Sequence, residues 1–452
     1  MWAWLGLGSE LSQTQKKLFL ALVLLGLGLR LAYGAVRYRA ELAHLTGNAF
    51  ISSWEHDARY HVLIAKALDS GEGYVVYDLP GAKPIRYAGQ PALFKAPLYQ
   101  YFLAGLFSLS GFSFWLMFPV QALLGGLTAG LVGLITLRMW PHPAGAWFAG
   151  IAAAANPILV NSASQPYNEN LFFFLFVAVV WVFLLWWERA TFRRAALGGA
   201  LIGLCMLTRE NGSILLVSIG LLLLFEKRWE TRVWAGYLVI AALTVAFVLP
   251  WTVKNWVKFH ALVPVAAIVG VDFVEGNNEC VAAEGIFIPY WAEGPCAEAD
   301  KELRPLLADG RFDPRTPAAV RLDQASKRVA LRFVVEHPSW YAKLAIRRLW
   351  TTLLPYDPRG SQRRHERLVL TAYWLLVYPA GMMGLLRAPK GPAAKFLVLL
   401  ICLSLASIMA VLYWSDLRFR VGIDLLLGCF AGWAWMQVVV GRRPKPLAIE
   451  RV

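Results

Sequence analysis

The chain has 452 residues, of which 58% are hydrophobic and only 16% are charged, whereas soluble globular domains carry about 25% charged residues. Apolar runs long enough to cross a hydrocarbon core of ~30 Å recur along the whole chain, which excludes a soluble enzyme and indicates a multi-pass membrane protein. The formal net charge of +15 does not indicate nucleic acid, because most Lys and Arg residues lie in short loops between apolar runs, where they set membrane orientation.

The first apolar run, residues 18–36, follows two lysines and lacks a small-residue cleavage site, so it is predicted to be a retained span with a cytoplasmic N-terminus. The short apolar piece 97–110 decides the number of crossings. If it spans the membrane there are eleven crossings, and if it lies in the interface there are ten. Ten are predicted, because every cytoplasmic turn is then basic, as orientation requires. The predicted spans are residues 18–36, 114–137, 144–159, 171–187, 195–207, 213–225, 233–251, 368–386, 396–414 and 421–440.

This topology predicts an all-α polytopic bundle with both termini cytoplasmic and two external regions. An N-terminal membrane module, 1–253, contains a first external loop, 37–113. An external region of mixed composition, 254–366, is predicted to form a small cap over the site, and 367–452 holds the last helices and a cytoplasmic tail. Cys280 and Cys296 lie in the cap, where an oxidising exterior allows either a disulfide or two free thiols.

The first external loop carries an unusual polar segment around Asp57. If this segment is helical, Asp57, Tyr60, His61 and Ile64 share one face. The helix is predicted to be amphipathic and to lie along the outer membrane surface. Asp57 is then either a site residue or a solvated carboxylate that pairs with Arg59 or caps the helix.

Further charges lie at the outer ends of spans. Glu169 begins a very apolar helix, where it is either a charge favoured by the helix dipole or a site residue. Arg209, Arg418 and Arg420 depart from the positive-inside pattern. They either snorkel or pair with nearby acidic residues, or they bind phosphate, which the guanidinium fork suits.

Together these residues predict a carboxylate pair and several arginines on the outer face of a bundle. A carboxylate can act as general base on an acceptor hydroxyl while arginines hold an anionic leaving group. A lipid-linked phosphosugar supplies such a leaving group at this depth. The chemistry implied is glycosyl transfer from a lipid phosphate.

The order of several short motifs resembles bacterial members of the GT-C superfamily of membrane glycosyltransferases. The branch is the one related to the dolichyl-phosphate-mannose protein mannosyltransferases and to the lipid A aminoarabinose transferase. The matching segments are residues 57–60, 71–74, 96–104, 207–211, 250–256, 263–265, 276–278 and 417–420.

The resemblance implies an inverting hexosyl or pentosyl transferase with a polyprenyl-phosphate sugar donor and a lipid, glycan or protein acceptor at the periplasmic face of the inner membrane. It implies that Asp57 is the base or orients the acceptor, that Glu169 matches a second acidic position, and that 97–110 is a juxtamembrane helix. The residues expected to bind donor phosphate are Arg209, Arg418, Arg420 and Arg59. Those expected to line the substrate site are His56, Tyr60, Lys95, Tyr99 and Glu210.

Many protein mannosyltransferases carry Asp-Glu in the first loop, whereas this chain has His56-Asp57-Ala58, which weakens protein O-mannosylation as the specific activity. There is no Gly-rich phosphate loop. The sequence leaves open whether a divalent metal bridges Asp57, Glu169 and phosphate. The competing hypotheses are a lipid or sugar transporter, which inverted repeats and mid-span charges would favour, and a non-catalytic envelope scaffold.

Overall fold

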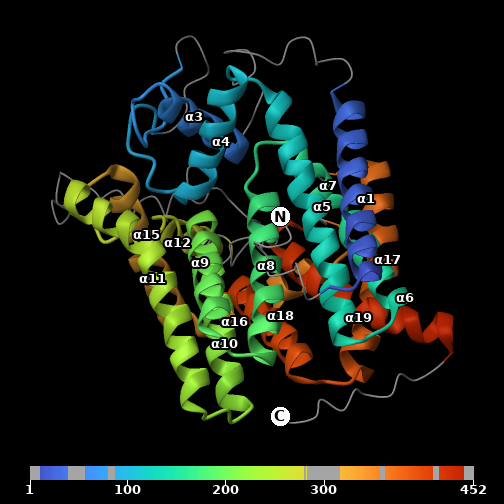
Figure 1. The fold of residues 1–452 in the computed structure, drawn as a ribbon. Coiled ribbons are helices and arrows are strands. Elements are labelled where there is room, and N and C mark those ends of the chain that lie inside the picture. The colour runs from blue at the N-terminus through green and yellow to red at the C-terminus, as the bar shows by residue number, and fades with distance from the viewer. Residues whose placement is uncertain are drawn as a thin grey trace.

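The computed structural model is a helical bundle (Figure 1), and it describes residues 11–38, 56–79, 87–278, 281, 316–356, 362–410 and 417–441. The first helices are α1 (Gln13–Arg37), α3 (His56–Asp69), α4 (Pro97–Ser110), α5 (Phe114–Met139), α6 (Pro143–Ala154), α7 (Pro157–Ala163), α8 (Glu169–Glu188) and α9 (Phe192–Thr208). The 3-10 turn η1 (Glu210–Gly212), α10 (Ser213–Phe225), α11 (Thr231–Phe259), α12 (Val269–Gly276), α15 (Ala318–Glu336) and α16 (Pro338–Leu353) follow. The last elements are α17 (Arg364–Arg387), α18 (Pro392–Ala410), η2 (Leu417–Arg420) and α19 (Val421–Val440). The predicted all-α class is confirmed.

Burial separates the central helices from the peripheral ones. Most of α5, α8 and α19 is buried, whereas only about a third or less of α1, α11, α17 and α18 is buried. A helix that is apolar all round yet largely exposed has a hydrocarbon environment, so the peripheral helices are the lipid-facing ones. The core sits around α8, the greenish helix in the middle of Figure 1.

Close packing in this bundle depends on glycines where two helices touch. Gly126 of α5 meets α1, and a Cβ built there would lie 2.5 Å from the carbonyl oxygen of Val23. Gly26 lies across the same contact, because its own Cβ would come within 2.9 Å of the Gly126 Cα. Small residues allow helix backbones to approach in this way where no hydrophobic driving force acts between helices in lipid.

Each of the ten predicted spans corresponds to helix in the described residues. Seven helices are long and apolar enough to cross a membrane, and the pair α6 and α7 would be an eighth. The helices α9 and α10 are shorter, with 17 and 13 residues, so the lengths alone do not establish ten crossings.

The span predicted at 144–159 is not a straight helix, because α6 and α7 meet there at a bend of 48°. Pro157 begins α7, and a proline inside a helix would remove a backbone bond and clash with the preceding turn. The Asn156 side chain caps the new helix, since its Oδ1 accepts from the backbone N–H groups of Ile158 and Leu159 at 3.1 Å each.

The turns that orientation places in the cytoplasm lie together at one end of the bundle. Arg138 at the end of α5 pairs with Glu188 at the end of α8. Lys395 of α18 pairs with Glu226 at the end of α10, with Nζ 2.6 Å from Oε1. Four basic turns that are distant in sequence therefore share one end, as an alternating up-and-down topology requires.

The predicted external segments contain helices, whereas residues 70–79 and 87–96 of the first loop form turns and isolated bridges. The helix predicted around Asp57 is α3, but His61 and Ile64 of its shared face are almost fully enclosed. It packs against α4 rather than lying open on a membrane surface. The described part of the predicted cap contains α12, α15 and α16, whereas Cys280 and Cys296 lie outside the described residues.

Candidate active site

The carboxylate of Asp57 lies in the first turn of α3 and is held by Lys95. Lys95 Nζ donates to Asp57 Oδ1 at 2.6 Å. The backbone around Lys95 is fixed in turn by Tyr74, whose hydroxyl donates to the carbonyl oxygens of Lys95 and Ala96 at 2.8 and 3.2 Å. The motif at 71–74 therefore has a physical role, because its tyrosine positions the lysine that pairs with Asp57.

The surroundings of Asp57 keep it ionised. Burial by itself raises the pKa of this carboxyl, but Lys95 and Arg418 together outweigh burial and hold the pKa well below its usual range. The side chain is still 43% exposed. Asp57 is therefore an accessible carboxylate, as a group that accepts a proton from a substrate has to be.

Glu169, the second predicted carboxylate, is the first residue of α8 and is 1% exposed. Its Oε1 accepts from Arg209 Nη1 at 3.2 Å. The partial positive charge of the α8 N-terminus adds to this stabilisation. Within the described residues, nothing donates a hydrogen bond to the other oxygen, Oε2.

Arg418 connects the two carboxylates. Its Nη2 lies 3.7 Å from Asp57 Oδ2, and its Nη1 lies 3.7 Å from Glu169 Oε1. The guanidinium also lies over the ring of Tyr167, 4.9 Å from the centroid. The first loop, α8 and the turn before α19 are thus joined at one side chain. Five predicted site residues form one cluster: Asp57, Lys95, Glu169, Arg209 and Arg418.

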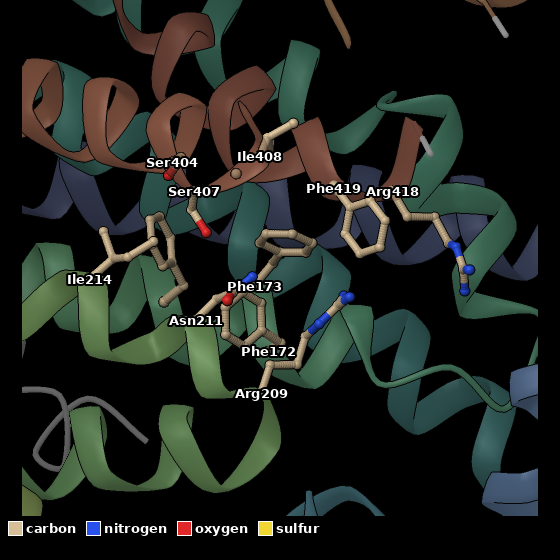
Figure 2. Close-up of a pocket in the computed structure, with 12 residues that line it drawn as sticks. Phe172, Phe173, Arg209, Asn211, Ile214, Ser404, Ser407, Ile408, Arg418 and Phe419 are labelled. Atoms are coloured by element: carbon tan, nitrogen blue, oxygen red, sulfur yellow. The ribbon is translucent and has the colours of Figure 1, made fainter. Parts of the chain in front are cut away.

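A largely apolar pocket of about 510 Å³, its open mouth included, adjoins this cluster. Figure 2 shows Arg209 and Arg418 toward one end of the row of lining side chains, with Ile214 and Ser404 toward the other. Four phenylalanines contribute to the wall of this pocket. The lining residues are Phe172, Phe173, Phe176, Arg209, Asn211, Ile214, Ser404, Ser407, Ile408, Arg418, Phe419 and Gly422.

Behind Asp57 lies a buried polar layer. His61 Nδ1 and Gln100 Nε2 are 2.8 Å apart, and the His61 ring packs edge-on against Tyr99 at 5.0 Å. Burial, together with Lys95, lowers the pKa of His61 to about 3, so this imidazole is neutral near pH 7. The Tyr99 hydroxyl donates to Gln121 Oε1 at 3.0 Å. Tyr99 therefore supports the site from behind and does not line the pocket.

The remaining predicted site residues have separate positions. Tyr60 packs edge-on against Phe94 with centroids 5.0 Å apart. Arg59 is half-buried and leaves α3 on a different side from Asp57, because positions i and i+2 do not face each other. His56 is the first residue of α3, and its side chain lies outside the described residues. Glu210 follows Arg209 in η1, and burial raises its pKa against the opposing effect of Arg209.

The structure does not bring Arg420 to the cluster. Its side chain is fully buried, its Nη2 donates to the carbonyl oxygen of Pro355 at 3.2 Å, and its Nε lies 3.5 Å from Asp424 Oδ1. Its Nη1 donates to the carbonyl oxygens of Thr352 and Leu354. These contacts direct the Arg420 guanidinium toward backbone carbonyls and Asp424 inside the bundle, away from the pocket lining, so its expected role in donor binding stays a prediction that this geometry does not favour.

Asp272 of α12 is not among the site residues predicted from the sequence. Burial, Glu210 and Asp57 raise the pKa of Asp272 to about 8, while Lys95 opposes the shift. The protonation of this carboxyl is therefore coupled to the charges of Asp57 and Lys95. An aspartate inside a short, mostly apolar segment was the signal available in the sequence.

In the part of the chain that the structure describes, no group of three His, Cys, Asp or Glu side chains is arranged to hold a metal ion. Asp57 and Glu169 are instead neutralised by Lys95, Arg209 and Arg418. The side chains at this place are thus a pair of carboxylates with cationic partners.

Comparison with known proteins places the fold. A family model described as dolichyl-phosphate-mannose-protein mannosyltransferase matches residues 94–253, whereas curated proteins give no match. The oligosaccharyltransferase AglB from Archaeoglobus fulgidus, in complex with an inhibitory peptide and a dolichol-phosphate, aligns with a TM-score of 0.51 at 14% identity, over 96% of this chain and 53% of that one. The chain has a GT-C fold.

A second archaeal structure supports the same conclusion. The A. fulgidus oligosaccharyltransferase tethered to an acceptor peptide with the NVT sequon aligns with a TM-score of 0.55 at 14% identity, over 94% of this chain and 50% of that chain. ArnT from Cupriavidus metallidurans bound to undecaprenyl phosphate aligns over 92% of this chain and 77% of that chain at 16% identity, with a TM-score of 0.39. The chain spans about half the length of the archaeal oligosaccharyltransferases. The predicted GT-C resemblance is confirmed at the level of the fold.

Proposed function

We propose that this GT-C protein is an inverting glycosyltransferase that moves a sugar from a polyprenyl-phosphate donor to an acceptor hydroxyl at the outer membrane face. The observation that carries the proposal is the position of Arg418. One guanidinium lies 3.7 Å from both site carboxylates and also lines an apolar pocket. An amphiphile with an anionic head and an apolar tail matches this combination.

The pocket supports a lipid-phosphate donor in two ways. Its phenylalanine wall offers apolar surface to an isoprenoid chain, while Arg209 and Arg418 offer forked donors to phosphate oxygens at one end. The Arg209 guanidinium lies over the rings of Phe172 and Phe419, with centroid distances of 5.7 and 5.5 Å. Such stacking keeps the fork in place without consuming its donors.

In the proposed reaction, Asp57 accepts the proton of the acceptor hydroxyl as its oxygen attacks the anomeric carbon. The bond from that carbon to the phosphate oxygen breaks, and polyprenyl phosphate leaves as an anion. The leaving group needs no acid because arginines stabilise its charge. The arginines thus take the place of the second carboxylic acid of a glycosidase.

Because Asp57 is paired with Arg418, donor binding is also expected to change the basicity of Asp57. Arg418 holds Asp57 in a poorly basic state, because a nearby cation lowers the pKa of a carboxyl. A donor phosphate that competes for Arg418 weakens this interaction and raises the pKa of Asp57. We therefore expect the base to become stronger when the donor is bound.

The proposed orientation puts the basic turns in the cytoplasm and the cluster on the periplasmic side. Under it, 1–253 forms the catalytic membrane module, 254–366 a cap that contacts the acceptor, and 367–452 the helices that complete the donor pocket. Arg418 and Ser404 already line that pocket from the last region.

Mass spectrometry of lipids that copurify with the protein tests the donor class. We expect a polyprenyl phosphate or its sugar conjugate with the wild type, and much less of it with Arg209→Gln. A variant with Arg347→Gln, an exposed residue of α16 away from the pocket lining, is the matched control. Copurification of the same lipid with all three proteins would contradict the proposal, as would a lipid without phosphate.

A further inference from the structure

A buried polar cluster lies between the described helices of the bundle, separate from the pocket lining. Asp424 of α19 is 1% exposed, and it accepts from the Tyr378 hydroxyl at 2.7 Å and from Asn156 Nδ2 at 3.2 Å. Arg420 Nε lies 3.5 Å from the same carboxylate. Asn156 Nδ2 also donates to the Tyr373 hydroxyl at 3.1 Å. An ionisable group this deep in an apolar bundle is costly to retain and indicates a role.

Asp424 is linked to Arg418 through Arg420 and the turn η2. Arg420 and Arg418 lie two residues apart in the 3-10 turn η2, which has about three residues per turn, so their side chains leave the turn in different directions. Arg420 points into the bundle, where the carbonyl oxygens of Thr352 and Pro355 accept from it at 3.4 and 3.2 Å. This attachment fixes the orientation of η2 and therefore the direction in which Arg418 reaches.

The second connection leads to the partners of Arg418. Asn156 caps α7, and the chain runs from α7 through a short turn to Tyr167 and Glu169. The guanidinium of Arg418 contacts these two residues, over the Tyr167 ring and 3.7 Å from Glu169 Oε1. One carboxylate, Asp424, thus holds both the segment that carries Arg418 and the segment that carries its partners.

We propose that Asp424 is a positioning residue, which holds the Arg418 guanidinium against Glu169 by anchoring η2 through Arg420 and α7 through Asn156. The proposal rests on the proposed role of Arg418 in binding donor phosphate. Breaking a buried charge pair leaves an uncompensated charge, so η2 would reorient rather than keep Arg420 in place without its partner. Loss of Asp424 is therefore expected to weaken donor binding in the site, although Asp424 itself touches no substrate.

The test is a double-mutant cycle between positions 424 and 418. The dissociation constant for undecaprenyl phosphate is measured in nanodiscs for the wild type, Asp424→Asn, Arg418→Gln and the double variant, each with its thermal unfolding midpoint. We expect Asp424→Asn to weaken binding about tenfold in the wild-type background and less than about twofold in the Arg418→Gln background. An equal loss in both backgrounds would overturn the proposal, as would no loss in a folded Asp424→Asn.

Two further variants separate positioning from general loss of stability. Thr244→Val removes a buried hydrogen bond from Thr244 to the Gly199 carbonyl, between α11 and α9, so it should lower the unfolding temperature and leave binding unchanged. If Asp424→Asn fails to fold, Tyr378→Phe removes one hydrogen bond from Asp424 and keeps every charge. The same background dependence is expected for it, on a smaller scale, and its absence would contradict the proposal.

A structural readout tests the positioning role of Asp424 without any ligand. If wild-type protein does not bind undecaprenyl phosphate, the proposed function is wrong, and an experimental map of Asp424→Asn still decides the positioning. We expect the separation between Arg418 Nη1 and Glu169 Oε1 to grow from 3.7 Å to well beyond the ~4 Å limit of an ion pair. An unchanged separation would refute the positioning role.

Discussion

Replacement of Arg418 by glutamine is the perturbation with the most specific consequences. Each of its two ion pairs, at 3.7 Å, corresponds to an attraction of about 4 kcal/mol at an effective dielectric constant of ~20, before desolvation. A lipid phosphate must compete with these carboxylates and gains a hydrogen bond to a charged group, which contributes about 1.5–3 kcal/mol. Removal of the guanidinium should therefore raise the dissociation constant for undecaprenyl phosphate roughly 10- to 150-fold.

The same change alters Asp57. With Arg418 gone, Lys95 remains the cation that lowers the pKa of Asp57, so this pKa should rise toward its ordinary value. The acid limb of activity of Arg418→Gln should accordingly lie at higher pH than that of the wild type. Affinity for the acceptor should change much less than affinity for the donor lipid.

The assay is equilibrium binding of undecaprenyl phosphate to protein in nanodiscs, with Arg347→Gln as the control for loss of one exposed positive charge. Size-exclusion profiles and unfolding midpoints establish that each variant is folded. The reasoning would be refuted by a folded Arg418→Gln whose dissociation constant stays within about twofold of the wild type. Equal weakening of donor and acceptor binding would also count against a phosphate contact.

Three further predictions concern the base, its lysine and the packing of α1. Asp57→Asn should fold and bind donor but lose about 10²–10⁴-fold in transfer in proteoliposomes, and undiminished turnover would end its role as base. Lys95→Gln removes a cation that lowers the pKa of Asp57, so the acid limb of kcat/KM should move to higher pH, whereas an unmoved limb would contradict the ion pair. Gly126→Ala should lower the unfolding temperature because its Cβ meets the α1 backbone, whereas Gly28→Ala, which has open space around it, should not; equal midpoints would refute the close contact.

The sequence determined the class and much of the layout of this protein. Apolar runs of span length have few stable conformations other than helix in a bilayer, because every backbone polar group must be satisfied internally. Periodicity around Asp57 likewise predicted a helix, and α3 is found there. The break at Asn156 was not predicted, since hydropathy registers composition and ignores the backbone bond that Pro157 removes.

For the candidate site, the sequence determined which residues are unusual, and the tertiary structure decided which of them meet. Asp57, Glu169 and Arg418 stood out because ionisable groups at the ends of apolar helices are rare. Arg420 stood out for the same reason, yet it faces the bundle interior and binds backbone carbonyls. Whether an arginine in a 3-10 turn faces the pocket or the core depends on how the turn is anchored by Asp424, a contact between side chains that composition and spacing do not encode.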